Sequence, residues 1–125
     1  MLTKAWEEIA ATYQDYAGDR QSIQALAGLA KRIKGSPLAR GLFAWTSMFD
    51  LCIVQTEVSE HPYNGPLLRI APTSSDQLEF TYEDTTDKTK RWRRTVDASD
   101  AFPRLLKFLD QLRWFPRDVL DSLSG

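Results

Sequence analysis

The chain has one cysteine and one histidine among its 125 residues. A single thiol excludes an internal disulfide, and one thiol with one imidazole leaves almost no ligands for a transition-metal site. Cys52 stands in an apolar stretch, residues 51–54, where a cysteine usually packs as a small buried hydrophobe. We therefore expect no metal, no cofactor and a structural role for Cys52.

The sequence also lacks long apolar runs and any excess of one charge. No stretch reaches the roughly 20 apolar residues of a transmembrane helix. The start of the chain carries Glu7, Glu8 and Asp15 and does not resemble a secretory signal. The formal net charge is -1, from 16 Lys and Arg against 17 Asp and Glu, which favours neither nucleic acid nor an anionic membrane. We expect a cytoplasmic protein without membrane contact.

The motifs of several enzyme classes are missing as well. There is no Gly-x-Ser-x-Gly elbow, no Gly-x-x-x-x-Gly-Lys loop and no Gly-x-Gly-x-x-Gly loop. Three acids near one turn, Glu83, Asp84 and Asp87, lack the ligand spacing and the glycine of an EF-hand. No motif supports enzymatic activity, and a pocket for a small molecule between helices and sheet is left open as a third hypothesis.

The N-terminal third of the chain predicts two helices. Apolar residues recur at three- and four-residue steps over residues 2–17, with Thr3 as the expected N-cap and Gly18 as the stop. A second such stripe, preceded by Asp19, ends before Gly35. Because about two residues join the helices, we expect an antiparallel helix hairpin.

The rest of the chain predicts strands and then a helix. Aromatic and branched residues, or clean alternation, mark strands over 42–55, 67–71, 77–84 and 90–96. The first run is polar near 47–50, so it is either one bent strand or two. A third helix starts at Ser99–Asp100 and runs to Leu112, and Pro116–Leu123 adds a short helical stretch. Short turns require antiparallel pairing.

These elements define the predicted fold class. We expect a single α+β domain over residues 1–125, built from an N-terminal antiparallel helix hairpin, an antiparallel meander of about four strands, and a C-terminal helix packed on the same sheet face. Hydrophobic residues make up 42% of the chain and fourteen are aromatic (4 Trp, 4 Tyr, 6 Phe), which is enough apolar area for a core of this size.

The most conspicuous motif is the basic run Lys90–Arg94, in which Trp92 stands among Arg91, Arg93 and Arg94. Cations and an aromatic ring are what single-stranded nucleic acid binds. In a strand, however, alternation places Lys90, Trp92 and Arg94 on one face and the other two arginines on the opposite face. The motif is therefore divided between two faces.

A structural hairpin explains the same residues. If Tyr82 lies opposite Trp92, one face of the strand pair is apolar and the other is polar, and each cross-strand pair contributes roughly 0.2–1 kcal/mol. The remaining predicted pairs are Glu83 with Arg91, Thr81 with Arg93, Phe80 with Arg94 and Leu78 with Val96. Arg94 then points to the buried face, so it must either extend past the sheet edge into solvent or find a carboxylate, for which Asp50 is the candidate.

Two other segments are candidate binding surfaces. The loop at 57–66 contains His61, Tyr63 and Asn64; Tyr63, framed by prolines and a glycine, is expected to be a stiff aromatic contact of the kind that interfaces use. Trp114 and Phe115 are adjacent at a helix end. Both can hardly point inward from one helix end, so one of them is a candidate for an exposed patch that would suit a homodimer or a partner protein, although core packing is the more common use of each ring.

The leading hypothesis is therefore a small non-enzymatic module for protein–protein contact or regulation, with a homodimer as one form of that contact. The alternative is nucleic-acid binding through Lys90–Arg94.

Overall fold

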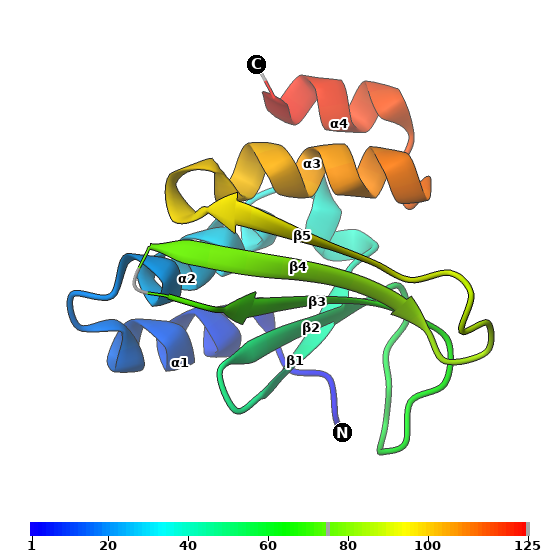
Figure 1. Ribbon diagram of the computed structural model, residues 1–125, viewed down its shortest axis with the longest axis horizontal. Coiled ribbons are helices and arrows are strands. Elements are labelled where there is room, and N and C mark those ends of the chain that lie inside the picture. The colour runs from blue at the N-terminus through cyan, green and yellow to red at the C-terminus, as the bar shows by residue number, and fades with distance from the viewer. Residues whose placement is uncertain (75, 125) are drawn as a thin grey trace.

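The computed structural model describes residues 1–74 and 76–124 and has the α+β class that the sequence predicts (Figure 1). The helices lie on one face of an antiparallel sheet. In chain order the elements are α1 (Trp6–Ala17), α2 (Gln21–Lys34), the 3₁₀ turn η1 (Pro37–Arg40), β1 (Phe43–Ser47), β2 (Asp50–Val54), β3 (Pro66–Pro72), β4 (Gln77–Asp84), β5 (Trp92–Asp97), the 3₁₀ turn η2 (Ala98–Asp100), α3 (Ala101–Leu112) and α4 (Arg117–Ser124).

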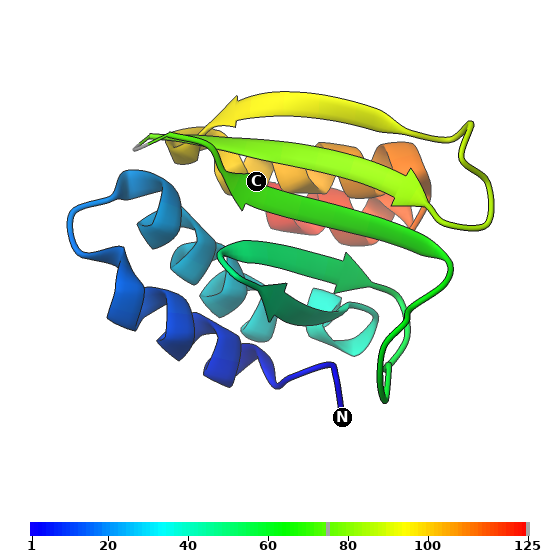
Figure 2. The same cartoon turned by 60° about the horizontal axis from the view of Figure 1, so that its bottom comes forward.

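The sheet is a meander with the order β1-β2-β3-β4-β5, so it has five strands rather than four (Figure 2). The difference lies in the run 42–55, which forms two strands. Ser47 pairs with Asp50, and the two residues between them, Met48 and Phe49, form the turn. The chain reverses at the polar interruption instead of bending there.

The predicted register of the last two strands is confirmed. Tyr82 pairs with Trp92, and the pairs Thr81–Arg93, Phe80–Arg94 and Leu78–Val96 follow. The pair of Glu83 with Arg91 is not part of the ladder, because β5 begins at Trp92. Alternation in β4 therefore set the faces of both strands correctly.

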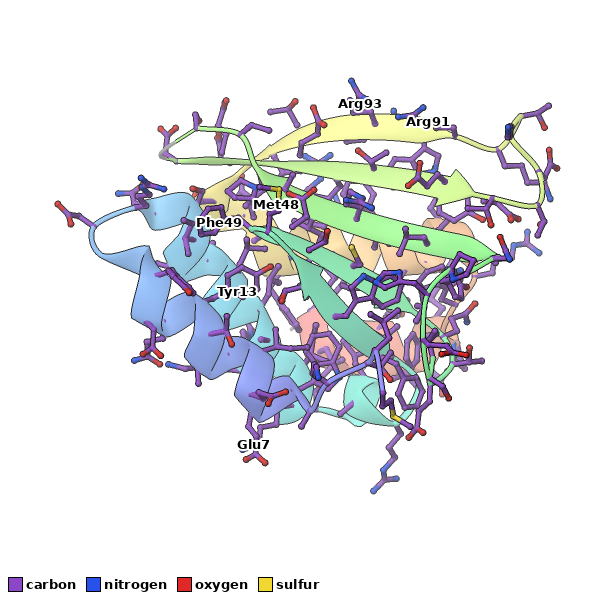
Figure 3. The ribbon with its side chains drawn as sticks, turned by 90° about the horizontal axis from the view of Figure 1, so that it is seen from below. Glu7, Tyr13, Met48, Phe49, Arg91 and Arg93 are labelled. Carbon is purple, nitrogen blue, oxygen red and sulfur yellow. The ribbon has the colours of Figure 1, made fainter. Side chains whose placement is uncertain are left out.

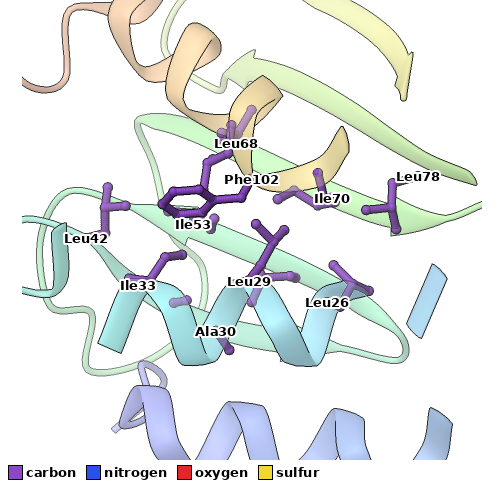
Figure 4. Close-up of a cluster of buried hydrophobic side chains, with 14 of the residues drawn as sticks. Leu26, Leu29, Ala30, Ile33, Leu42, Ile53, Leu68, Ile70, Leu78 and Phe102 are labelled. Atoms are coloured by element: carbon purple, nitrogen blue, oxygen red, sulfur yellow. The ribbon is translucent and has the colours of Figure 1, made fainter. Parts of the chain in front are cut away.

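The main core lies between the sheet and the helices (Figure 4). Leu26, Leu29 and Ile33 of α2 point toward the apolar residues of the central strands, and Phe102 of α3 closes the same cluster. The strand residues that complete it, all buried, are Leu51, Ile53, Leu68, Ile70, Leu78, Phe80 and Val96. Helix α1 packs on α2, and α4 packs on α3.

A second, smaller cluster lies on the opposite face of the sheet. Trp45, Cys52, Val54 and Leu67 are buried there. The extended N-terminal residues cover them together with loop 57–65: the Leu2 amide donates to the Val58 and Ser59 carbonyls. Thr3 belongs to this segment and is not the N-cap of α1, which begins at Trp6. Cys52 is fully buried, as expected.

Within the residues that the structure describes, no helix has the length and apolar character needed to cross a membrane.

The core makes a direct stability test possible at Phe80, whose side chain is fully buried against Phe108. Phe80→Ala leaves a cavity under α3, and we expect the free energy of unfolding to fall by about 3–5 kcal/mol. Urea denaturation followed by circular dichroism measures the change. Arg91→Ala, an exposed change in the same β-hairpin, serves as control and is expected to stay within about 0.5 kcal/mol of the wild type. Equal stability of the two variants would contradict this core.

Candidate functional site

The aromatic residues of loop 57–65 face the protein. The Tyr63 ring packs on Trp45 with centroids 5.8 Å apart, and its hydroxyl donates to the Pro66 carbonyl at 2.7 Å. His61 is exposed and lies edge-on to Trp45 at 6.1 Å, and Asn64 is exposed. Burial also raises the pKa of Tyr63. Tyr63 therefore holds the loop over the second cluster and does not project from it as a free contact.

The basic strand separates its ring from two of its cations. Trp92 lies on the helix-covered face, stacked on Tyr82 at 5.9 Å and packed against Phe108 at 4.9 Å. Arg91 and Arg93 are exposed and lie along the outer edge of the sheet (Figure 3). A nucleic-acid base on the open sheet face would therefore lie near Arg91 and Arg93, but it could not stack on the Trp92 ring, which lies on the opposite face.

The expected pairing of Arg94 with Asp50 is wrong. Arg94 is exposed, its Nη1 donates to the Arg93 carbonyl at 2.9 Å, and its guanidinium lies 5.5 Å from the Trp92 ring centroid. Asp50 bonds Arg69 at 3.1 Å. The register explains the difference: Arg94 aligns with Phe80 and Leu51 on the helix-covered face, so Asp50, next to Leu51, lies on the other face.

Trp114 and Phe115 both pack against the main core and are half-buried, so core packing is confirmed for each ring and the alternative of an exposed patch there is wrong. Arg113 has a left-handed backbone with φ 59°, which reverses the chain after α3. The Trp114 ring then meets Tyr82 edge-on at 6.4 Å. Phe115 lies on Gly41, where a Cβ atom would come within 2.8 Å of the ring.

Three exposed apolar residues lie together elsewhere, Met48 and Phe49 at the turn between β1 and β2 and Tyr16 near the end of α1. We call Tyr16, Met48 and Phe49 the hairpin-tip surface; their exposed fractions are 64%, 93% and 41%. The Tyr16 and Phe49 rings meet edge-on with centroids 5.9 Å apart. Figure 3 shows Met48 and Phe49 together at the end of the hairpin, near the α1 residue Tyr13.

A solvent-open hollow of about 490 Å³ adjoins this surface. The start of α2 and the β3–β4 turn complete its walls. Its lining residues are Arg20, Ser22, Ile23, Met48, Phe49, Asp50, Pro72, Thr73 and Ser74. Asp50 is engaged by Arg69, while no carboxylate of the described residues pairs with Arg20. The hollow therefore combines an apolar wall with one uncompensated positive charge.

A buried side chain of α1 supports the hairpin tip. The buried Tyr13 hydroxyl donates to the Phe49 carbonyl at 3.0 Å, and burial raises the pKa of this phenol. Met48 has φ 56°, a conformation that favours glycine or asparagine. Met48, although almost fully exposed, thus holds a strained backbone conformation that glycine or asparagine would adopt at lower energy. Strained backbone of this kind clusters at functional sites, so this turn is a candidate contact.

Sequence patterns do not single out the hairpin-tip surface. Tyr16, Met48 and Phe49 are apolar residues within amphipathic or strand-like runs, where composition predicts burial. The turn also lacks the Asn-Gly or Gly-x pair that marks a two-residue hairpin. The available signal is the polar interruption at Ser47 and Asp50, which brackets the two exposed residues.

Metal ligands are not gathered anywhere in residues 1–74 and 76–124: no group of three or more His, Cys, Asp or Glu side chains converges there.

The chain matches no known protein-family model, no curated protein and no solved structure. Its function is therefore inferred from the surfaces described above.

The strain at Met48 is directly testable. We expect Met48→Gly to raise the free energy of unfolding by about 0.5–1 kcal/mol, because glycine adopts a positive φ without steric cost. The neighbouring change Phe49→Gly is the matched control: Phe49 does not have a positive φ, so glycine there lowers stability. Thermal and urea unfolding of both variants measures the difference. A destabilised Met48→Gly would show that the turn is not strained.

Burial of Cys52 predicts a loss of stability in alkali. Desolvation raises the pKa of its thiol from 9.0 to about 11. The unfolded chain releases this proton first, so the contribution is complete below pH 9 and is lost as the pH rises through 11. Between about pH 8 and about pH 11, we expect wild type to lose roughly 2 kcal/mol more than Cys52→Ala. Urea unfolding at the two pH values measures this; equal losses would contradict the burial of the thiol.

Proposed function

We propose that this chain is a non-enzymatic protein-binding module whose contact surface is the hairpin-tip surface with its adjoining hollow. The observation that carries the proposal is Met48, which is 93% exposed and held at positive φ beside two exposed aromatic rings. Methionine and aromatic side chains are enriched at protein interfaces, and methionine adapts its shape to a partner. A scattered exposed apolar residue needs no explanation, but here the exposed Phe49 meets the exposed Tyr16 and lines a hollow together with Met48.

The hollow indicates the chemistry of the partner. Its apolar wall, from Ile23, Phe49 and Pro72, suits an apolar side chain. Arg20 at its margin lacks a carboxylate partner among the described residues, so it favours a negative charge next to that side chain. We therefore expect a partner protein that inserts an apolar anchor flanked by Asp or Glu.

The polar groups around the hollow support binding more than catalysis. Its hydroxyls come from Ser22, Thr73 and Ser74, and its lining contains no histidine. His61 packs on Trp45, within the second cluster on the open sheet face. A serine or threonine nucleophile needs a base within hydrogen-bond reach. Rigid apolar contact is the property that this surface offers.

Nucleic-acid binding through Lys90–Arg94 has less support. Trp92 contributes to the core rather than to a stacking surface, and Arg93 lies 3.4 Å from Glu79. If Arg91 and Arg93 bound nucleic acid by themselves, they would contact its phosphate backbone, and the affinity would fall steeply as the salt concentration rises.

The proposal is tested by site-specific photo-crosslinking in the native host. A benzoylphenylalanine replaces Met48 in one strain and Lys88 in another; Lys88 lies in the β4–β5 turn, at the other end of the molecule from the β1–β2 turn (Figure 1). We expect a discrete protein adduct from position 48 and none from position 88. Arg20→Glu should reduce the adduct at least about tenfold, since it reverses the charge at the hollow.

The matched control is Arg40→Glu, the same charge change at an exposed residue that does not line the hollow. It should leave the adduct unchanged. The crosslinked partner peptide should contain an apolar residue next to Asp or Glu. Adducts of equal yield from both positions, or equal loss in the two arginine variants, would contradict the proposal. A nuclease-sensitive complex that dissociates with salt would favour the alternative.

A further inference from the structure

The two edges of the sheet differ. The edge strand β1 is covered by the N-terminal segment, because Lys4 forms a bridge with Ala44 and its amide donates to the Ala44 carbonyl at 2.8 Å. At the other rim, no strand of the described residues pairs with the outer side of β5, and Figure 2 shows β5 at the border of the sheet. Exposed edges usually carry features that control pairing with another chain.

The hydrogen-bond pattern shows which backbone groups of β5 point outward. The Ala98 amide donates to the Asp76 carbonyl, so Ala98 and Asp76 form a hydrogen-bonded pair. In an antiparallel ladder such pairs recur at every second residue, and the next ones are Val96–Leu78, Arg94–Phe80 and Trp92–Tyr82. The N–H and C=O groups of the residues between them, Arg93, Thr95 and Asp97, therefore face away from β4. The Arg94 guanidinium binds the Arg93 carbonyl from solvent, which agrees with this direction.

We propose that a second copy of the chain pairs with this edge, β5 to β5, antiparallel and centred on Thr95. This register brings Arg93 opposite the partner's Asp97, and by symmetry Asp97 opposite the partner's Arg93. Thr95 lies opposite the partner's Thr95. Three pairs with two backbone hydrogen bonds each join the copies, and the two sheets become one continuous sheet.

Charge selects this register over its neighbours. If the symmetry axis passed through Arg94, the Arg94 side chains of the two copies would lie opposite each other. An axis through Arg93 would bring the two copies of Arg93 together in the same way. A centre at Val96 brings Thr95 opposite the partner's Asp97 and leaves Arg93 without a charged partner on the strand. Like charges directly opposite in a sheet are destabilising, whereas opposite charges stabilise it. Among the residues of β5, only the centre at Thr95 gives two opposite-charge pairs, and Arg93 then lies between Glu79 of its own chain and the partner's Asp97.

The dimer leaves the hairpin-tip surface free, because that surface lies at the β1–β2 end of the sheet order. The inference therefore does not rest on the proposed function. A dimer with two such surfaces would also bind a repetitive partner with increased avidity.

Sedimentation equilibrium of the full chain tests the pairing, from about 1 μM to about 1 mM, a range that covers weak protein affinities. We expect wild type to reach twice the mass of one chain. Arg93→Asp and Asp97→Arg should each raise the dimer dissociation constant at least about tenfold, because each creates two like-charge pairs across the axis. The double variant Arg93→Asp/Asp97→Arg restores the pairs and should return toward wild-type affinity.

Two further variants distinguish this register from a general charge effect. Arg91→Asp makes the same charge change at an exposed residue outside β5 and should leave the dimer intact. Thr95→Pro removes an N–H that points away from β4, so the fold should persist by circular dichroism while the dimer is lost.

A monomeric wild type over the whole range would overturn the inference. So would a dimer that survives both single charge reversals, since that dimer forms elsewhere, or a double variant that fails to recover while its circular dichroism is native.

Discussion

Burial of Leu78, Phe80 and Tyr82 beneath the helices fixes the side of the sheet on which every other strand residue lies. Side chains alternate along a strand, and antiparallel pairs keep opposite residues on one face. Because β5 pairs with β4, Trp92 and Val96 of β5 face the core, whereas Arg93 and Thr95 face solvent. The same constraint passes through β3 to β2, where Leu51 and Ile53 turn inward and Asp50 and Cys52 turn to the open face.

The same constraint separates the roles of the two ends of the sheet. At the β5 rim, alternation leaves Arg93 on the open face, and the backbone groups of Arg93, Thr95 and Asp97 point away from β4. At the β1–β2 turn, the end of α1 and the start of α2 lie beside the two turn residues but leave their side chains exposed: the Tyr16 ring meets Phe49, and Ile23 lines the hollow with Met48 and Phe49. Tyr13 ties this turn to α1, so the exposed side chains of Met48 and Phe49 are presented from a supported position. A rigid apolar contact loses less conformational entropy on binding than a mobile one.

The regular parts of the fold could be predicted from the sequence because they follow from periodicity. Alternation in 77–84 gave the face of β4 and, with Tyr82 opposite Trp92, the register of β5. The two N-terminal helices followed from the spacing of residues such as Ile9, Tyr13 and Leu26. The fifth strand was left open because Met48 and Phe49 carry no turn signal. The pairing of Arg94 with Asp50 failed for the same reason, since the face of Asp50 depends on where β2 begins.

The candidate site was harder to predict because exposure is a tertiary property. Apolar residues such as Tyr63, Trp114 and Met48 look alike in a sequence, and the backbone reversal at Arg113 decides that Trp114 and Phe115 turn inward. Similarly, nothing local distinguishes Met48 from a core methionine until the hairpin is formed. The candidate residues Tyr63, Trp92, Trp114 and Phe115 pack against one of the two clusters, whereas no sequence pattern singled out Tyr16 or Met48 as a contact residue.

Methionine oxidation tests the central claim most directly, because the chain has two methionines and both are exposed: Met48 at 93% and Met1 at 70%. Limited peroxide treatment, followed by peptide mass spectrometry, compares their rates in the isolated protein and in extract of the native host. We expect similar oxidation of both residues in isolation and selective protection of Met48 in the extract. Equal oxidation of Met48 and Met1 in both samples would contradict a partner at the hairpin tip.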